Sequence, residues 1–304
     1  MNFFDPETGA RGAASGKVIL LGEHAVVYGE PALAVALRRG VTACARRIDG
    51  PLVLRAEKWQ LWVKADDVGA PARAVCALCK ELGVDPSGVA VDLEPQIPPR
   101  AGLGASAAMA VAVARSLAQF FDRPLPDEML QRAVHASECV FHGSPSGLDA
   151  AVSLTGESLL FSKSEGATPI SASVPPLLVV HSGIPKDTAT SVARFAARMK
   201  EFPEESSRRI AHIGALARRG VECLIQNDLA ALGALMTENH RHLQWFDVSC
   251  EALDRIVALA LEAGALGAKL TGGGRGGCAV ILLPSNPAPV LTAVHASGFK
   301  EVFS

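Results

Sequence analysis

The chain contains both short apolar runs, which are typical of strands, and longer amphipathic patterns, which are typical of helices. Buried or alternating apolar runs predict strands at 17–21, 52–54, 61–64, 89–93, 157–163, 177–181, 266–270, 278–283 and 299–303. Apolar residues at helical spacing predict helices at 71–82, 105–121, 127–142, 188–202, 205–226, 228–243, 249–263 and 288–296. Both halves mix strands with helices without strict alternation, so we expect an α+β protein.

A polar stretch at 163–173 is the expected domain boundary, because it separates two segments that are each rich in apolar patterns. A chain of 304 residues exceeds the usual length of one domain. We therefore predict an N-terminal domain at 1–165 and a C-terminal domain at 166–304.

Charge and hydropathy narrow the class of protein. The formal net charge of −2 argues against nucleic acid or an anionic membrane as a partner. The longest uncharged apolar stretch, 101–114, is too short to span a bilayer, and no signal-peptide pattern opens the chain. The Cys76-x-x-Cys79 pair lies in a helical pattern without a second pair at zinc spacing, so we expect reduced, buried thiols. These features predict a cytoplasmic protein.

The segment 98–108 carries the strongest chemical signal. It reads Pro-Pro-Arg-Ala-Gly-Leu-Gly-Ala-Ser-Ala-Ala and leads into an Ala/Val-rich helix. Backbone amides at a helix N-terminus favour an anion, most often a phosphate. No Lys follows the glycines, so this is not the phosphate loop that ends in Gly-Lys-Ser/Thr.

A dinucleotide-binding fingerprint is the competing interpretation of this segment. Gly102, Gly104 and Ala107 have its spacing, and the acid Asp122 follows at a suitable distance. That motif requires a strand between the helix and the acid. Residues 105–121 instead predict one helix that ends in a turn at Asp122, which argues against the fingerprint.

Three further segments hold polar groups that could act on a ligand. Lys17 opens an apolar strand, and Glu23 and His24 follow its end. Glu138 borders the buried side of a predicted helix and is either solvated or a Mg²⁺ ligand; a zinc site with His135 and His142 lacks the usual spacing. The turn 143–149 presents the carboxylate of Asp149, a candidate general base.

A glycine-rich loop, 269–277, joins two predicted strands near the C-terminus. It reads Lys-Leu-Thr-Gly-Gly-Gly-Arg-Gly-Gly. Such a loop allows the backbone to approach a ligand or another backbone closely, and a flexible hairpin is the alternative.

Together these motifs resemble those of the GHMP kinases. The similarity covers about residues 14–283, and the segments 22–29 and 141–149 look most like those of members that phosphorylate mevalonate. The resemblance implies a two-domain fold with an N-terminal domain like domain 2 of ribosomal protein S5. It implies a ferredoxin-like C-terminal domain that closes the active-site cleft.

The resemblance also implies roles for individual residues. Asp149 and Lys17 would be catalytic, Glu23, His24 and Thr188 would bind the substrate, and Ser106 and Glu138 would bind Mg²⁺. The nucleotide would contact the loop and its support, namely Pro99, Arg100, Ala101, Gly102, Leu103, Gly104, Ala105, Ser106, Ala107, Gly273 and Gly274. The implied reaction moves a phosphoryl group from ATP to the primary alcohol of mevalonate, in a monomer or homodimer.

Two alternatives stay open at this point. A sibling kinase would act on phosphomevalonate, a sugar or homoserine, and a metabolite sensor on the same fold would bind without turnover. Three residues depart from the family pattern: Ala105 replaces a second Ser, Ala150 replaces an Asn, and Arg275 interrupts the last glycine run. We expect Arg275 to reach phosphate.

Overall fold

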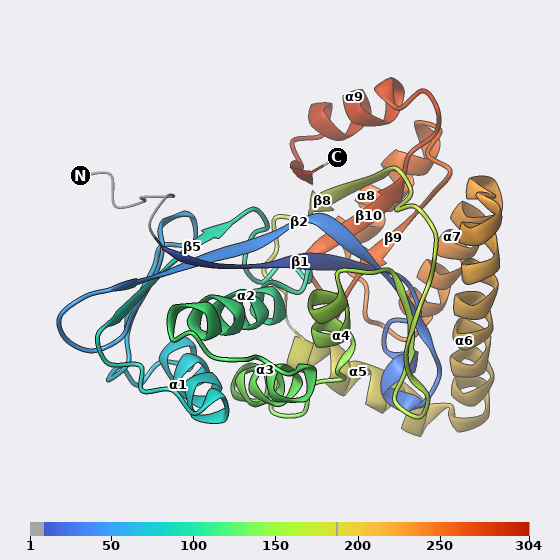
Figure 1. Cartoon of the computed structure of the whole chain (residues 1–304). Helices are drawn as coiled ribbons and strands as arrows, with labels where there is room; N and C mark the ends of the chain where they lie inside the picture. Colours follow the sequence, from blue (N-terminus) through green and yellow to red (C-terminus); the bar gives the residue numbers. More distant parts are fainter. Residues whose placement is uncertain (1–8, 187, 304) are drawn as a thin grey trace. The chain divides into compact units, whose positions relative to one another are not determined.

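A computed structural model describes residues 9–186 and 188–303 (Figure 1). The chain divides into two compact units. The first unit comprises residues 1–17, 36–99 and 104–156, and the second comprises 18–35, 100–103 and 157–304. The chain therefore crosses between the units several times. The predicted domain boundary between residues 165 and 166 assumes that the chain passes from one domain to the other only once, and it stays a prediction.

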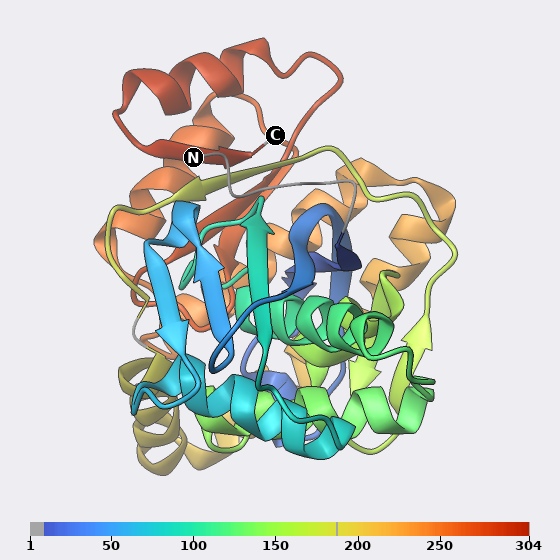
Figure 2. The ribbon, with the colours of Figure 1, turned by 60° about the vertical axis from the view of Figure 1, so that its left-hand side comes forward.

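The strands of the first unit form part of a seven-stranded sheet. Strands β3 (Val53–Ala56), β4 (Leu61–Lys64) and β5 (Val89–Pro95) lie wholly in this unit, whereas β1 (Ala10–Leu21) and β2 (Ala32–Arg47) continue into residues 18–35 of the second unit. The order is β4-β3-β5-β2-β6-β7, with β1 beside β2. Strands β3, β4 and β5 stand next to one another in Figure 2, where β3 and β5 run parallel and β3 and β4 antiparallel.

Four α-helices belong to the described part of the first unit. They are α1 (Ala70–Leu82), α2 (Ala105–Phe120), α3 (Asp127–His142) and α4 (Leu148–Thr155), and a short 3-10 helix spans Glu57–Trp59. Helix α2 is buried from Ala107 to Ala114, because its alanines and valines leave no bulky polar side chain on any face. Helices α1, α2 and α3 lie on one face of the strands of this unit (Figure 1).

The second unit contains its own four-stranded antiparallel sheet of β8 (Leu177–His181), β9 (Gly267–Thr271), β10 (Cys278–Leu282) and β11 (Lys300–Phe303). Its order is β11-β8-β10-β9. With the helices that follow β8 and with α9 (Ala288–Ala296), this gives the β-α-β-β-α-β succession of a ferredoxin-like fold. The expected C-terminal fold is thereby confirmed.

The remaining elements of the second unit are mostly helical. They are α5 (Thr188–Glu201), α6 (Pro203–Gln226), α7 (Leu229–Trp245), α8 (Glu251–Glu262), a 3-10 helix at Ala25–Tyr28, and strands β6 (Leu159–Ser162) and β7 (Gly166–Pro169). Alternate strand residues, such as Leu178 and Val180, enter one core with Phe195 and Phe246. This period of two matches a sheet covered by helices on one face.

The α+β class and most predicted elements are confirmed. Strand β2 was not predicted, and two other predictions were wrong. The turn predicted up to Asp149 gives way to helix α4 at Leu148, and Lys17 lies inside β1 rather than at its start. The polar boundary stretch also contains β7, which pairs with β6. None of the described helices combines the length and apolar character of a membrane span.

Candidate functional site

Lys17 and Asp149 form an ion pair in the first unit. Lys17 Nζ lies 3.0 Å from Asp149 Oδ1. The lysine side chain is 2% exposed, whereas that of Asp149 is 32% exposed. The pair thus combines a buried cation with a carboxylate that solvent or a ligand can reach.

The start of α4 places the Asp149 side chain. Gly147 precedes the helix with φ of 91°, a backbone conformation that glycine adopts without strain. Asp149 then lies in the first turn, where the helix dipole favours a negative charge. The glycines and proline of 143–147 therefore turn the chain and begin the helix that carries the carboxylate.

Ser106 and Glu138 both face the ring of His142. Ser106 Oγ lies 3.3 Å from His142 Nε2, and Glu138 Oε2 lies 3.8 Å from the same nitrogen. Glu138 is buried at the end of α3, and Ser106 is in the first turn of α2. A hydroxyl and a carboxylate are hard oxygen ligands of the kind Mg²⁺ prefers, so the donor set fits that ion.

The zinc interpretation of this helix is not supported. His135 Nε2 faces Cys139 Sγ at 3.4 Å, whereas His142 faces Ser106 and Glu138. The histidines therefore engage different neighbours. Among the described residues, the cluster with metal-binding geometry is a different one, on α6 and α7.

Two glycines of the predicted phosphate loop have positive φ angles and close neighbours. Gly104 has φ of 73° immediately before α2, and a methyl group there would lie 3.1 Å from Lys17 Cγ. Gly102 has φ of 84°, and a methyl group there would lie 3.3 Å from the Thr271 carbonyl oxygen. Each glycine thus allows both a left-handed backbone and a close neighbour. The first-turn amides of α2 have no partner within the helix, as at any helix N-terminus.

The dinucleotide interpretation does not fit the structure. Helix α2 runs without a break from Ala105 to Phe120. Asp122 lies in the turn after it, with φ of 49°, and the next element is helix α3. The strand that this motif requires between the helix and the acid is therefore replaced by a turn and a helix.

Three predicted residues meet in the second unit: His24, Thr188 and Gly273. His24 Nε2 lies 2.9 Å from the Gly273 carbonyl oxygen, and a methyl group at Gly273 would lie 3.3 Å from Thr188 Oγ1. Burial, together with the charges of Lys186 and Lys269, lowers the pKa of His24 to about 4, although the hydrogen bond to Gly273 acts in the opposite direction. The ring is therefore neutral near pH 7, with its proton on Nε2 toward the carbonyl and a lone pair on Nδ1.

Glu23 lies at the centre of a buried polar group in the same unit. Lys269 Nζ donates a hydrogen bond to Glu23 Oε1, and Asn239 Nδ2 donates one to Glu23 Oε2 at 3.2 Å. The side chains of Glu23 and Lys269 are 1% and 0% exposed. The carboxylate is thus held in place by two donors, one from β9 and one from α7.

The glycine-rich loop also has a structural role. A methyl group at Gly274 would lie 2.0 Å from the Val248 carbonyl oxygen, so this position packs directly against another backbone segment. Arg275 Nη1 lies 3.0 Å from Asp247 Oδ1, and Arg194 also pairs with Asp247. The expectation that Arg275 reaches phosphate gives way to an ion pair that fixes the loop.

Sequence reasoning missed Asn239 and did not assign roles to Lys269 or His142. Asn239 lies in an ordinary helical pattern, and only the fold brings it to Glu23. Lys269 could have been suspected, because a lysine inside a strand buried on both faces needs an anionic partner. No local signal pairs His142 with Ser106.

Comparisons of this chain with family models, known sequences and solved structures agree on one family. Residues 70–157 match the GHMP kinases N terminal domain, and residues 221–300 match GHMP kinases C terminal. Mevalonate kinases of Thermococcus sibiricus and Pyrococcus abyssi are each 33% identical, covering 94% of this chain and 92% of theirs. A crystal structure of L. major mevalonate kinase in complex with R-mevalonate superposes with a TM-score of 0.85 at 29% identity, over 97% of this chain and 95% of that one. The chain belongs to the GHMP kinase family.

Proposed function

We propose that this chain transfers the γ-phosphoryl group of ATP to the primary hydroxyl of mevalonate, giving 5-phosphomevalonate. The relatives named above are mevalonate kinases and match nearly the whole chain. The observation that carries the proposal is the 3.0 Å contact between the buried Lys17 ammonium and the accessible Asp149 carboxylate. An alcohol attacks a phosphorus atom most readily when a base removes its proton and a cation stabilises the resulting oxygen anion.

In the proposed reaction, Asp149 accepts the proton of the substrate hydroxyl. Lys17 holds the Asp149 carboxylate in place and stabilises the developing negative charge on the attacking oxygen. Transfer of a phosphoryl group otherwise depends mainly on positioning and on neutralisation of charge. A general base typically contributes about 10²–10⁴-fold to the rate.

The nucleotide is assigned to the loop 99–107 and to Gly273 and Gly274. Members of this family use ATP, and the first-turn amides of α2 suit its phosphates. Ser106 and Glu138 would hold Mg²⁺ because they provide hydroxyl and carboxylate oxygens. When bound, the ion neutralises phosphate charge.

Glu23, His24 and Thr188 are assigned to the substrate. The neutral ring of His24 offers Nδ1 as an acceptor for a hydroxyl group, since Nε2 is directed at Gly273. Thr188 Oγ1 is next to the same glycine. Glu23 is buried and bound by Lys269 and Asn239, so it acts through its fixed charge and position.

A substrate panel tests the proposal. ADP formation is measured with mevalonate, phosphomevalonate, galactose and homoserine under the same conditions. We expect kcat/KM for mevalonate to exceed the others by at least about 100-fold, because alcohols that leave polar groups of the site unpaired are discriminated against strongly. A preference for another alcohol identifies a sibling kinase, and nucleotide binding without turnover identifies a sensor. The cytoplasmic location and the monomeric or homodimeric state stay predictions from the sequence.

A further inference from the structure

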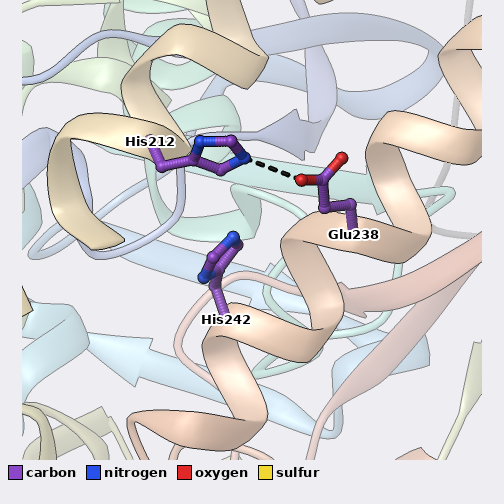
Figure 3. Close-up of side chains that lie close together, drawn as sticks. All are labelled: His212, Glu238 and His242. Carbon is purple, nitrogen blue, oxygen red and sulfur yellow. Dashed lines mark hydrogen bonds and ion pairs between the residues drawn. The ribbon is translucent and has the colours of Figure 1, made fainter. Parts of the chain in front are cut away.

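We propose that His212, Glu238 and His242 form a binding site for a divalent transition-metal ion such as Zn²⁺, on helices α6 and α7 of the second unit. Each of the three residues can provide one ligand atom, and these atoms all lie within 4.8 Å of one another (Figure 3). Two imidazoles and one carboxylate form a donor set that Zn²⁺ uses in proteins, with a water molecule completing the tetrahedron. The site involves none of the residues assigned to catalysis.

The helices bring the three side chains together. Glu238 and His242 are one turn apart on α7 and therefore lie on the same face of that helix. His212 reaches them from α6, and its Nε2 lies 2.7 Å from Glu238 Oε1. Figure 3 shows the His242 ring beside that hydrogen-bonded pair. A metal ion linking these residues would connect the two helices.

The distances require only a small adjustment. Ligand atoms of tetrahedral zinc with bonds of 2.0–2.1 Å are about 3.3 Å apart. His212 and Glu238 would therefore open slightly as the ion replaces the shared proton, while His242 would move inward. The side chains of His212 and Glu238 are 46% and 42% exposed, so an ion reaches them directly from solvent.

Arg209 is the group that opposes binding. Its Nη1 lies 3.1 Å from His242 Nδ1, where the guanidinium can only donate. The neutral His242 ring then carries its proton on Nε2, the nitrogen left for a metal. Burial and the neighbouring His212 and Arg209 lower the pKa of His242 to about 4, which keeps the ring neutral near pH 7. Metal binding through Nε2 would move the ring proton to Nδ1, and the new Nδ1–H donor would displace Arg209.

Arg209 has other partners that could receive it. Its Nε lies 2.7 Å from Glu205 Oε1, and its guanidinium lies 4.6 Å from the centre of the Trp245 ring. The hydrogen bond to His242 can therefore break without leaving the guanidinium without neighbours. Replacement of Arg209 by Gln should tighten metal binding, because an amide oxygen can accept a hydrogen bond from Nδ1–H and a positive charge is removed.

The test is titration of the purified, chelator-treated full chain with Zn²⁺, followed by calorimetry and by thermal unfolding. We expect one site whose affinity falls by about 100-fold or more in His212→Gln and His242→Gln, and rises by about tenfold in Arg209→Gln. His295→Gln is the matched control, since His295 Nε2 pairs with Glu301 at 2.8 Å and no third metal-ligating side chain joins them among the residues that the structure describes. If His242→Gln unfolds, His212→Gln still provides the test, because His212 lies at an exposed position.

Two results would overturn the proposal. One is the absence of saturable Zn²⁺ binding at micromolar concentration. The other is binding that His212→Gln and His242→Gln leave unchanged, which would assign the ion to the cysteines or to another group. Substitution by Co²⁺ separates these sources, since a nitrogen and oxygen site lacks the charge-transfer absorption of a thiolate ligand.

Discussion

The ammonium of Lys17 lies 3.0 Å from the carboxylate of Asp149, and the two groups differ sharply in their exposure to solvent. Strand β1 buries the lysine, whereas the first turn of α4 leaves the aspartate partly open. The burial of a lone ammonium is costly, so Asp149 stabilises Lys17 as much as Lys17 activates Asp149. This reciprocity determines what substitution at either position should do.

Replacement of Lys17 by Met should remove activity without removing the fold. Methionine fills a similar space, and Asp149 is exposed enough to be hydrated when the ammonium is absent. We predict a loss of about 10²-fold or more in kcat, because the cation that stabilises the attacking oxygen is absent. Steady-state kinetics with circular dichroism as a fold control measure this. A kcat within a few-fold of the parent would exclude the role assigned to Lys17.

The approach of Gly104 to Lys17 gives a prediction with a close control. Gly104→Ala places a methyl group 3.1 Å from Lys17 Cγ at a position with φ of 73°. Gly156→Ala imposes similar strain, with φ of 70° in the same left-handed region, but the nearest neighbour of its methyl group is Ser15 Oγ at 3.9 Å. Both should lose about 1–2 kcal/mol of stability from the left-handed backbone. Only Gly104→Ala should also lower kcat, and equal activity in the two variants would contradict this.

The buried pair of Glu23 and Lys269 should be sensitive to loss of one partner. Lys269→Met leaves a buried carboxylate without its cation and should cost about 3–5 kcal/mol. Asn239→Ala removes one hydrogen bond to the same carboxylate and should cost about 1.5–3 kcal/mol. Denaturant unfolding of each variant gives these values. The double variant Glu23→Gln, Lys269→Met removes both charges, so it should lose less stability than the sum of the two single losses. A strictly additive loss would argue against direct pairing.

The pKa of His24 makes stability depend on pH in a defined direction. The folded protein resists protonation of this ring until about pH 4, whereas an unfolded chain takes up the proton near 6.5. The unfolded state therefore binds more protons between these values, and stability falls as the pH drops through this window, by about 3 kcal/mol in total.

His24→Asn tests that direction. Asparagine tolerates the positive φ of 63° at this position but does not titrate there. The variant should lose the part of the acid-induced decrease that is due to His24, and ring resonances of His24 in the parent should titrate near pH 4. Titration near 6.5 would show that the ring is not shielded as described.

Much of the fold could be predicted from periodicity, because most elements bury one face. Strands β8 and β10 and the first half of helix α2 are apolar segments bounded by glycine or polar residues. Strand β2 was missed because its sixteen residues mix an apolar half with Arg38 and Arg39, so neither period dominates. Helix α4 was missed because its eight residues follow a turn rich in Gly, Ser and Pro.

The sequence predicts those site residues that belong to recognisable motifs. It does not predict contacts between residues that lie far apart along the chain. Lys17 and Asp149 were named from separate motifs, and the structure places them in contact. The partnership of Glu23 with Asn239 depends on a separation of 216 positions along the chain, for which a sequence carries no local signal. The same is true of Arg275, whose partner Asp247 lies on another segment.

In the proposed reaction, Asp149 accepts the proton of the mevalonate hydroxyl. The most direct test is kcat for mevalonate phosphorylation by Asp149→Asn, which keeps the size of the side chain and removes the base. We predict a fall of about 10²–10⁴-fold with nucleotide affinity little changed. A kcat within a few-fold of the parent would contradict the account.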